Sequence, residues 1–184
     1  MTDDTRALGM VEPGTHGTGF VRAPETSPDG MTFTVGARAS TMPGEYMLRA
    51  GWFGEHEVHC DEPESIGGQD EYPPPLGYMG LALGFCSLTQ VMRIAHLRHI
   101  DIERAECMVE MDWWSTGSLA NGTARTGCKE VRTRYAVQSS ESPETIAELI
   151  QQAEDGCYVN NLVLTATPTR SFVELNGRDI TGDG

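Results

Sequence analysis

Apolar and polar positions alternate in short runs over the first part of the chain. The alternation in MTFTVGARAS, from Met31, predicts a strand, and a PGE turn leads to two further extended runs, YMLRAGWFG and EVHC. Residues 64–75 are polar and rich in Gly and Pro, which predicts a loop. Residues 1–30 carry no periodicity and are rich in Gly, Pro, Thr and Asp. We therefore expect a flexible leader over residues 1–30 and a single domain over residues 31–184.

A long helix is predicted after this loop, beginning with the proline run that precedes Leu76. Apolar residues that mark a buried face recur at three- and four-residue steps: Leu76, Met79, Leu83 and Cys86. Gly77, Gly80 and Gly84 recur with helical spacing on one face. Glycine costs about 1 kcal/mol per position inside a helix. This glycine face therefore predicts the close approach of another helix backbone.

The second half of the chain predicts a hairpin followed by a helix. Two extended runs within residues 103–138 flank Asn121-Gly122, which is a strong hairpin-turn signal. Ser142, followed by proline and glutamate, is typical of a helix start, and Gly156 is typical of a helix end. The pattern therefore places a second helix between these two residues.

A final pair of strands is expected over residues 162–168 and 170–177. The order of elements is then strands, long helix, hairpin, helix and strands. Such an order is typical of an α+β fold and not of a doubly wound parallel sheet.

The charge balance argues against two classes of partner. The chain has 27 acidic and 13 basic side chains and a net charge of −14, whereas nucleic acids and anionic membranes require basic surface. It contains no apolar run of about 18 residues that would span a bilayer, and its first residues lack the features of a signal peptide. Five irregularly spaced cysteines do not form the pattern of a secreted disulfide framework. We expect a cytoplasmic protein whose thiols are mostly reduced.

Two cysteines are the main candidates for chemistry. Cys86 lies deep inside the predicted long helix, and Cys157 lies just past the predicted end of the second one. If the fold brings them together, oxidation of one thiol followed by disulfide formation is the chemistry that they can perform. Cys86 lies about 12 residues into its helix, too far for the helix dipole to lower its pKa, so its activation requires a nearby cation. Taken alone, a cysteine in an apolar helix is usually an inert core residue.

Several segments in their order resemble the OsmC/Ohr family of osmotically induced and organic hydroperoxide resistance proteins. They are GGQDEYPPP before the long helix, LGFC near its middle, AEDGC after the second helix, and the closing strands, together spanning roughly residues 31–180. The resemblance implies antiparallel sheets wrapped around two central helices in an intertwined homodimer. It also implies that the helix that approaches the glycine face belongs to the partner subunit.

The same resemblance implies roles for individual residues. Cys86 corresponds to the peroxidatic thiolate, and Cys157 corresponds to the thiol that resolves its sulfenic acid into a disulfide. An arginine would hold Cys86 charged, and its expected place between the first strands favours Arg38, with Arg49 and Arg93 as alternatives.

The implied activity is that of a peroxidase that reduces organic hydroperoxides with an external thiol as reductant and without a cofactor. Leu76 stands where the family's peroxidases usually carry a glutamate that pairs with the arginine, and Tyr158 stands where proline is usual. Two alternatives therefore stay open. The scaffold would serve another thiol-dependent reaction on a small apolar or organosulfur metabolite, or the dimer would bind a hydrophobic ligand without catalysis.

The segment HEVHC superficially suggests a metal site. Strand alternation places His56 and Cys60 on one face and His59 on the other, whereas zinc requires three or four convergent ligands. We therefore expect no metal. Cys107 and Cys128 lie on predicted strands, where packing is their expected role.

Overall fold

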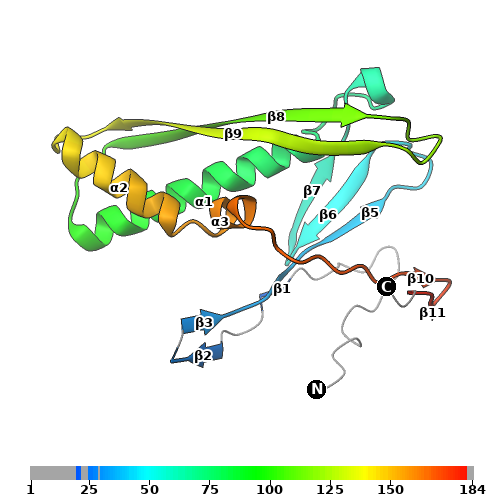
Figure 1. The fold of residues 1–184 in the computed structure, drawn as a ribbon, viewed down its shortest axis with the longest axis horizontal. Helices are drawn as coiled ribbons and strands as arrows, with labels where there is room; N and C mark the ends of the chain where they lie inside the picture. Colours follow the sequence, from blue (N-terminus) through cyan, green and yellow to red (C-terminus); the bar gives the residue numbers. More distant parts are fainter. Residues whose placement is uncertain (1–19, 22–24, 29, 182–184) are drawn as a thin grey trace. The chain divides into compact units, whose positions relative to one another are not determined.

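The structure, a computed structural model, describes residues 20–21, 25–28 and 30–181 (Figure 1). It divides into two compact units. One comprises the described residues up to Pro75 together with those from Thr169 onward, and the other comprises Leu76–Pro168. Most of the expected leader over residues 1–30 lies outside the described residues. The single domain expected over residues 31–184 stays a prediction.

The first unit is built from short antiparallel strands. Its largest sheet has the order β5-β6-β7, formed by β5 (Arg38–Thr41), β6 (Arg49–Phe53) and β7 (His56–Cys60). Its described residues also form three two-stranded pairs: β1 (Phe20–Val21) with β4 (Val35–Gly36), β2 (Glu25–Ser27) with β3 (Gly30–Thr32), and β10 (Glu174–Leu175) with β11 (Arg178–Asp179). The strand expected from Met31 is therefore divided among β3, β4 and β5.

The loop that follows β7 is organised by the buried Asp61, which is 2 % exposed. Its carboxylate accepts hydrogen bonds from the backbone N–H groups of Glu62, Gln69 and Glu71 at 2.8, 2.9 and 3.3 Å. Burial raises the pKa of Asp61, but these N–H groups outweigh burial and lower it. Gly68 is required in this loop, because a Cβ there would lie 1.7 Å from the carbonyl oxygen of Glu62. The loop also contains η2, a short 3₁₀ helix over Glu64–Ile66.

The second unit packs helices against one long hairpin (Figure 1). Its elements are α1 (Pro75–Arg98), β8 (Arg104–Thr116), β9 (Arg125–Gln138), α2 (Pro143–Asp155) and α3 (Tyr158–Leu164). The core lies where α1 meets α2, around Val91, Ala95, Leu149 and Ala153. The prediction of an α+β fold with a long helix, a hairpin and a second helix is confirmed. No helix within the described residues is both long and apolar enough to cross a membrane.

The local signals at the hairpin and at α2 act as the sequence predicts. Gly122 adopts a positive φ of 65° in the turn between β8 and β9, which glycine tolerates without strain. The Ser142 side chain caps α2 by accepting a hydrogen bond from the Thr145 N–H at 3.2 Å.

The strand expected over residues 162–168 was wrong, because α3 occupies Tyr158–Leu164. The side chain of Cys157 caps this helix by accepting a hydrogen bond from the Asn160 N–H at 3.4 Å. The Asn161 side chain donates to the carbonyl oxygens of Asp155 and Cys157, each at 2.9 Å. These local hydrogen bonds outweigh the weak strand preference of the aliphatic residues that follow.

The glycine face of α1 meets a strand of the same chain. A Cβ on Gly80 would lie 3.2 Å from Met111 Cε, and one on Gly84 would lie 3.7 Å from both the Cys107 carbonyl oxygen and Val109 Cγ2. Within one chain, the missing side chains thus let β8 approach α1. The contact of this face with a helix of a second copy stays a prediction.

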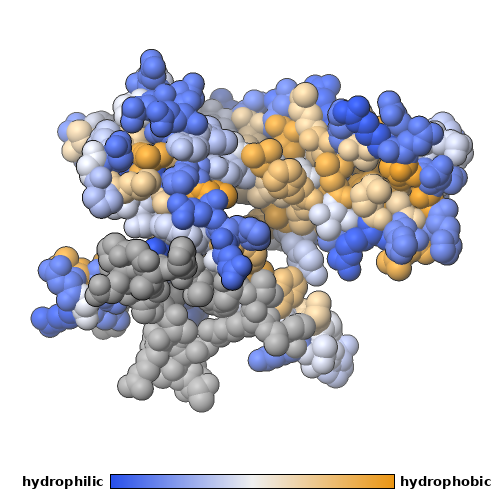
Figure 2. Space-filling view, turned by 180° about the vertical axis from the view of Figure 1, so that it is seen from behind, coloured by the Kyte–Doolittle hydropathy of each residue, from blue (hydrophilic) through white to orange (hydrophobic). Residues whose placement is uncertain are grey.

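Apolar side chains gather on the surface of the second unit (Figure 2). Leu81, Phe85 and Met92 on α1 are 44 %, 64 % and 47 % exposed. Spacings of four and seven residues place them on one face of the helix. Contiguous exposed apolar surface of this kind is typical of an interaction site.

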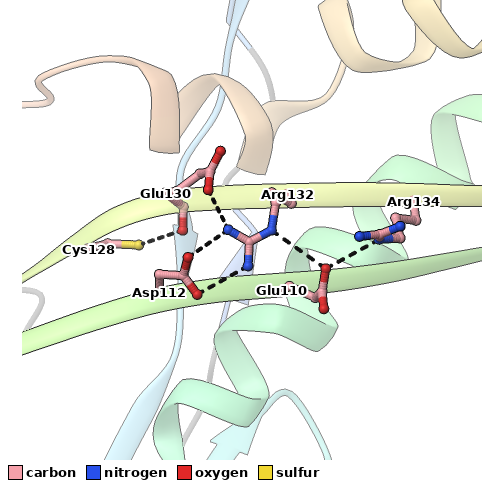
Figure 3. A network of polar contacts seen from close by, with 6 residues as sticks. All are labelled: Glu110, Asp112, Cys128, Glu130, Arg132 and Arg134. Atoms are coloured by element: carbon pink, nitrogen blue, oxygen red, sulfur yellow. Dashed lines mark hydrogen bonds and ion pairs between the residues drawn. The ribbon is translucent and has the colours of Figure 1, made fainter.

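An ion-pair network ties the two strands of the hairpin together (Figure 3). Arg132 forms ion pairs with Glu110, Asp112 and Glu130, and its two hydrogen bonds to Asp112 measure 2.6 and 3.1 Å. Arg134 joins through Glu110 at 3.3 Å. Asp112 and Glu130 lie directly opposite one another in the register. The arginine therefore offsets a repulsion between like charges on paired strands.

Candidate active site

The structure brings Cys86 and Cys157 together within the second unit. Cys86 lies near the middle of α1 and is partly exposed, whereas Cys157 precedes α3 and is 0 % exposed. The two thiols are free, and they are near enough for each to shift the pKa of the other. Adjacency of two thiols is the geometric requirement for a disulfide.

The first turn of α3 and a serine of α1 surround this pair. The N–H of Asn160 points at Cys157 Sγ at 3.4 Å, and the N–H groups of Tyr158 and Val159 contact Cys86. Ser87, which is 1 % exposed, places its Oγ 3.6 Å from Cys157 Sγ. The buried sulfur atom of Cys157 thus lies among hydrogen-bond donors.

These donors shift the two pKa values in opposite directions. Burial raises the pKa of Cys157, but the Asn160 N–H, the Ser87 hydroxyl and the Cys86 thiol together outweigh burial and lower it. Burial raises the pKa of Cys86, the neighbouring Cys157 adds to the rise, and the backbone N–H groups of α3 only partly offset it. The hydrogen-bond donors thus favour the charged form of Cys157, whereas burial disfavours that of Cys86. This is the reverse of the thiolate at Cys86 that the family resemblance implies.

The three candidate arginines are divided between the two units. Arg38 lies on β5 in the first unit, with its guanidinium carbon 4.4 Å from the centroid of the Trp52 ring. Arg49 lies on β6 of the same unit and donates to two backbone carbonyl oxygens at 2.9 and 2.8 Å. Arg93 lies on α1, as Cys86 does. The choice of an activating arginine stays a prediction.

Sequence reasoning missed three neighbours of the pair: Ser87, Cys107 and Tyr135. Cys107 and Tyr135 face each other across β8 and β9, and burial raises both pKa values, that of Tyr135 to about 12. The Tyr135 hydroxyl is buried beside Ser87 but has no well-formed hydrogen bond to any described residue. The one available signal was the alternation along the hairpin, which puts Cys107 and Tyr135 on the same face.

An apolar groove of about 270 Å³ runs between α1 and β8. Gly77, Gly80 and Gly84 leave it open, and Leu76 and Cys107 are among the residues that line it. Cys86 does not line this groove. Two residues along a helix correspond to a rotation of about 200°, so Cys86 points away from the side of α1 on which Gly84 lies.

The HEVHC segment forms β7 and shows no sign of a metal site. His59 contacts the Tyr72 ring, with 5.0 Å between centroids, and its Nε2 lies 3.3 Å from the Glu57 carboxylate. Throughout the part of the chain that the structure describes, no three His, Cys, Asp or Glu side chains converge as metal ligands would.

A model of the OsmC-like protein family matches residues 68–171, which is more than half of the chain. The chain belongs to the OsmC-like family. The resemblance found in the sequence is thereby confirmed. The matched segment of this OsmC-like protein includes both thiols and α1, the hairpin, α2 and α3.

Solved structures show the same fold. An OsmC-like protein from Mycoplasma pneumoniae has a TM-score of 0.58 at 17 % identity, covering 71 % of this chain and 86 % of that one. An organic hydroperoxide resistance protein from Elizabethkingia anophelis has a TM-score of 0.55 at 18 % identity, covering 72 % and 89 %. An OsmC-like hydroperoxide resistance protein from Jannaschia sp. has a TM-score of 0.53 at 20 % identity, covering 78 % and 95 %. Among curated proteins, none matches this chain.

Proposed function

We propose that this OsmC-like protein is a thiol-dependent peroxidase that reduces organic hydroperoxides through Cys86 and Cys157. The observation that supports this most is the contact between a partly exposed thiol and a buried one. A peroxide reaches Cys86 first because Cys157 has no exposed surface. The names of structural neighbours as hydroperoxide resistance proteins agree with this proposal.

The first step is the attack of Cys86 on the distal oxygen of the hydroperoxide. The O–O bond breaks, an alcohol leaves, and Cys86 becomes a sulfenic acid. The Cys86 thiol, which is partly exposed, loses its proton to solvent before the attack, and the departing alkoxide takes up a proton from solvent. Arg38 is our proposed source of positive charge for this step, with Arg49 and Arg93 as alternatives, because a cation stabilises the thiolate that attacks.

The second step forms a disulfide between the two cysteines. The Cys157 thiolate attacks the sulfur of the Cys86 sulfenic acid, an S–S bond forms, and hydroxide leaves. An external thiol then reduces the disulfide and restores both cysteines. Such a reductant belongs to a reducing compartment, so a cytoplasmic location is part of this proposal.

Rapid mixing with hydroperoxides tests the proposal. The protein should be oxidised by cumene hydroperoxide faster than by hydrogen peroxide, and peptide mapping should find a Cys86–Cys157 disulfide. Cys86→Ser should abolish the reaction, since it removes the attacking sulfur. Cys128→Ser is the matched control because Cys128, expected to be a packing residue, is exposed on β9 and donates to the Glu130 carbonyl oxygen at 3.2 Å. Oxidation that persists in Cys86→Ser would exclude the mechanism.

A second candidate function is another thiol-dependent reaction on a small apolar or organosulfur metabolite. Leu76, in place of the glutamate usual in the family's peroxidases, favours it. The apolar groove between α1 and β8 separately favours the third possibility, a dimer that binds a hydrophobic ligand without catalysis.

A further inference from the structure

Ser87 differs from the other hydroxyl residue nearby on α1. A serine or threonine inside a helix commonly donates to the carbonyl oxygen four residues earlier, and Thr89 does so to Phe85 at 2.8 Å. Ser87 is 1 % exposed, and its Oγ lies 3.6 Å from the sulfur atom of Cys157, at the beginning of another helix. The buried hydroxyl therefore contacts the second thiol of the pair directly.

Cys157 needs such a partner whenever it is charged. Its sulfur is fully buried, and a buried anion is stable only when hydrogen bonds replace those of water. The Asn160 N–H supplies one donor at 3.4 Å. A thiolate only accepts hydrogen bonds, so the single proton of the Ser87 hydroxyl must point toward the sulfur. The backbone donor cannot be changed by side-chain substitution, whereas the serine can.

Within the described residues, the titratable groups that influence the pKa values of this pair and of its neighbours carry no positive charge. They are Cys86 on α1, Cys107 on β8, Tyr135 on β9 and Glu154 on α2. The Glu154 carboxylate also accepts a hydrogen bond from Thr133 at 3.1 Å. Since each of these groups is neutral or negative, hydrogen-bond donors must stabilise an anion on Cys157.

We propose that Ser87 is a positioning residue that holds Cys157 as the nucleophile for the disulfide-forming step. This inference rests on the proposed function for its place in a reaction cycle. In this role Ser87 does not itself react, and it acts through its contact with Cys157. In this step the Cys157 thiolate attacks the sulfur of the Cys86 sulfenic acid. The S–S bond forms as the S–O bond breaks, and hydroxide leaves.

Single-turnover kinetics of Ser87→Ala separate this role from a structural one. After a pulse of cumene hydroperoxide, the sulfenic acid at Cys86 should form at nearly the wild-type rate. Disulfide formation should be about tenfold slower at neutral pH, because loss of the donor lowers the thiolate fraction of Cys157. The rate of the variant should recover as the pH rises. Ser87→Thr retains the hydroxyl and should restore the rate, and Thr89→Ala should leave it unchanged.

Oxidation by diamide tests Ser87 independently of peroxide chemistry. Diamide activates a thiol as an adduct, and Cys157 must attack the adduct at Cys86 to form the same disulfide. Slower closure in Ser87→Ala supports the inference even if no hydroperoxide oxidises the wild type, an outcome that would remove only the proposed function. Closure at the wild-type rate and with the wild-type pH profile in Ser87→Ala would overturn the inference. Ultraviolet absorbance of the thiolate in Cys86→Ser, with and without Ser87→Ala, should show the pKa of Cys157 rising in the double variant.

Discussion

Leu76, near the start of α1, is the residue whose substitution distinguishes the proposed peroxidase from an enzyme with another thiol-dependent reaction. It is 47 % exposed and lines the groove beside β8. In the family's peroxidases a glutamate at this position pairs with the arginine that activates the first cysteine. A charge-assisted hydrogen bond of that kind contributes roughly 1.5–3 kcal/mol, and each 1.36 kcal/mol corresponds to about tenfold in rate.

We therefore expect Leu76→Glu to accelerate the consumption of cumene hydroperoxide by about tenfold or more, measured with dithiothreitol as reductant. Leu97→Glu is the control, because Leu97 is 74 % exposed near the other end of the same helix and does not line this groove. A flat rate in Leu76→Glu, together with loss of some other thiol-dependent activity in Cys86→Ser, would favour the second candidate function. Apolar ligand binding without any thiol chemistry would favour the third.

The cysteines of the candidate site could be identified from the sequence, but their electrostatics could not. Cys86 and Cys157 were recognisable because each is the last residue of a family motif, LGFC near the middle of the long helix and AEDGC after the second helix. The pKa values depend on Ser87 and on the N–H groups of α3. Ser87 is one of many small residues in α1, and nothing in its spacing shows that a sulfur atom lies beside it. The helix α3 was itself hidden, because its last residues belong to a run that resembles a strand.

Among the larger elements, α1, the hairpin and α2 were predictable because their signals are local and long. Apolar periodicity over several turns, a turn glycine and a serine cap each determine structure without help from distant residues. The run from Met31 failed as a single strand because strand boundaries depend on pairing partners elsewhere in the chain. Its alternation persists across β3, β4 and β5, which pair with three different strands.

The Asp61 loop gives a prediction for stability against pH. The folded pKa of Asp61 is lowered, so its carboxylate stabilises the fold above the unfolded value of about 3.9 and loses that effect as the pH falls through the folded pKa. Asp61→Asn should unfold at lower urea concentration than the wild type near neutral pH, and the difference should shrink as the pH falls below about 4. Glu71→Gln, an exposed side chain in the same loop, should show little difference at any pH. A gap between Asp61→Asn and wild type that stays constant with pH would contradict this account.

At the scale of the whole molecule, the exposed apolar face of α1 supports assembly. Burying Leu81, Phe85 and Met92 against a second copy would remove apolar surface from water, and the family resemblance implies a homodimer. We expect light scattering at micromolar concentration to show a dimer and Phe85→Glu to shift it toward the monomer. Leu119→Glu is the control, because Leu119 is 90 % exposed in the turn between β8 and β9 and lies apart from this face. A monomeric wild type would contradict the expectation.

The sulfur atom that caps α3 is also the atom that the proposed cycle would oxidise. In the reduced protein, Cys157 Sγ accepts the Asn160 N–H and begins the helix. Once that sulfur is bonded to Cys86 it carries no negative charge and is a weaker acceptor, so the first turn of α3 loses part of its cap. Each turnover would then loosen and restore the same helical turn. The redox state of the pair would thereby become visible in the backbone as a change in how tightly α3 is held.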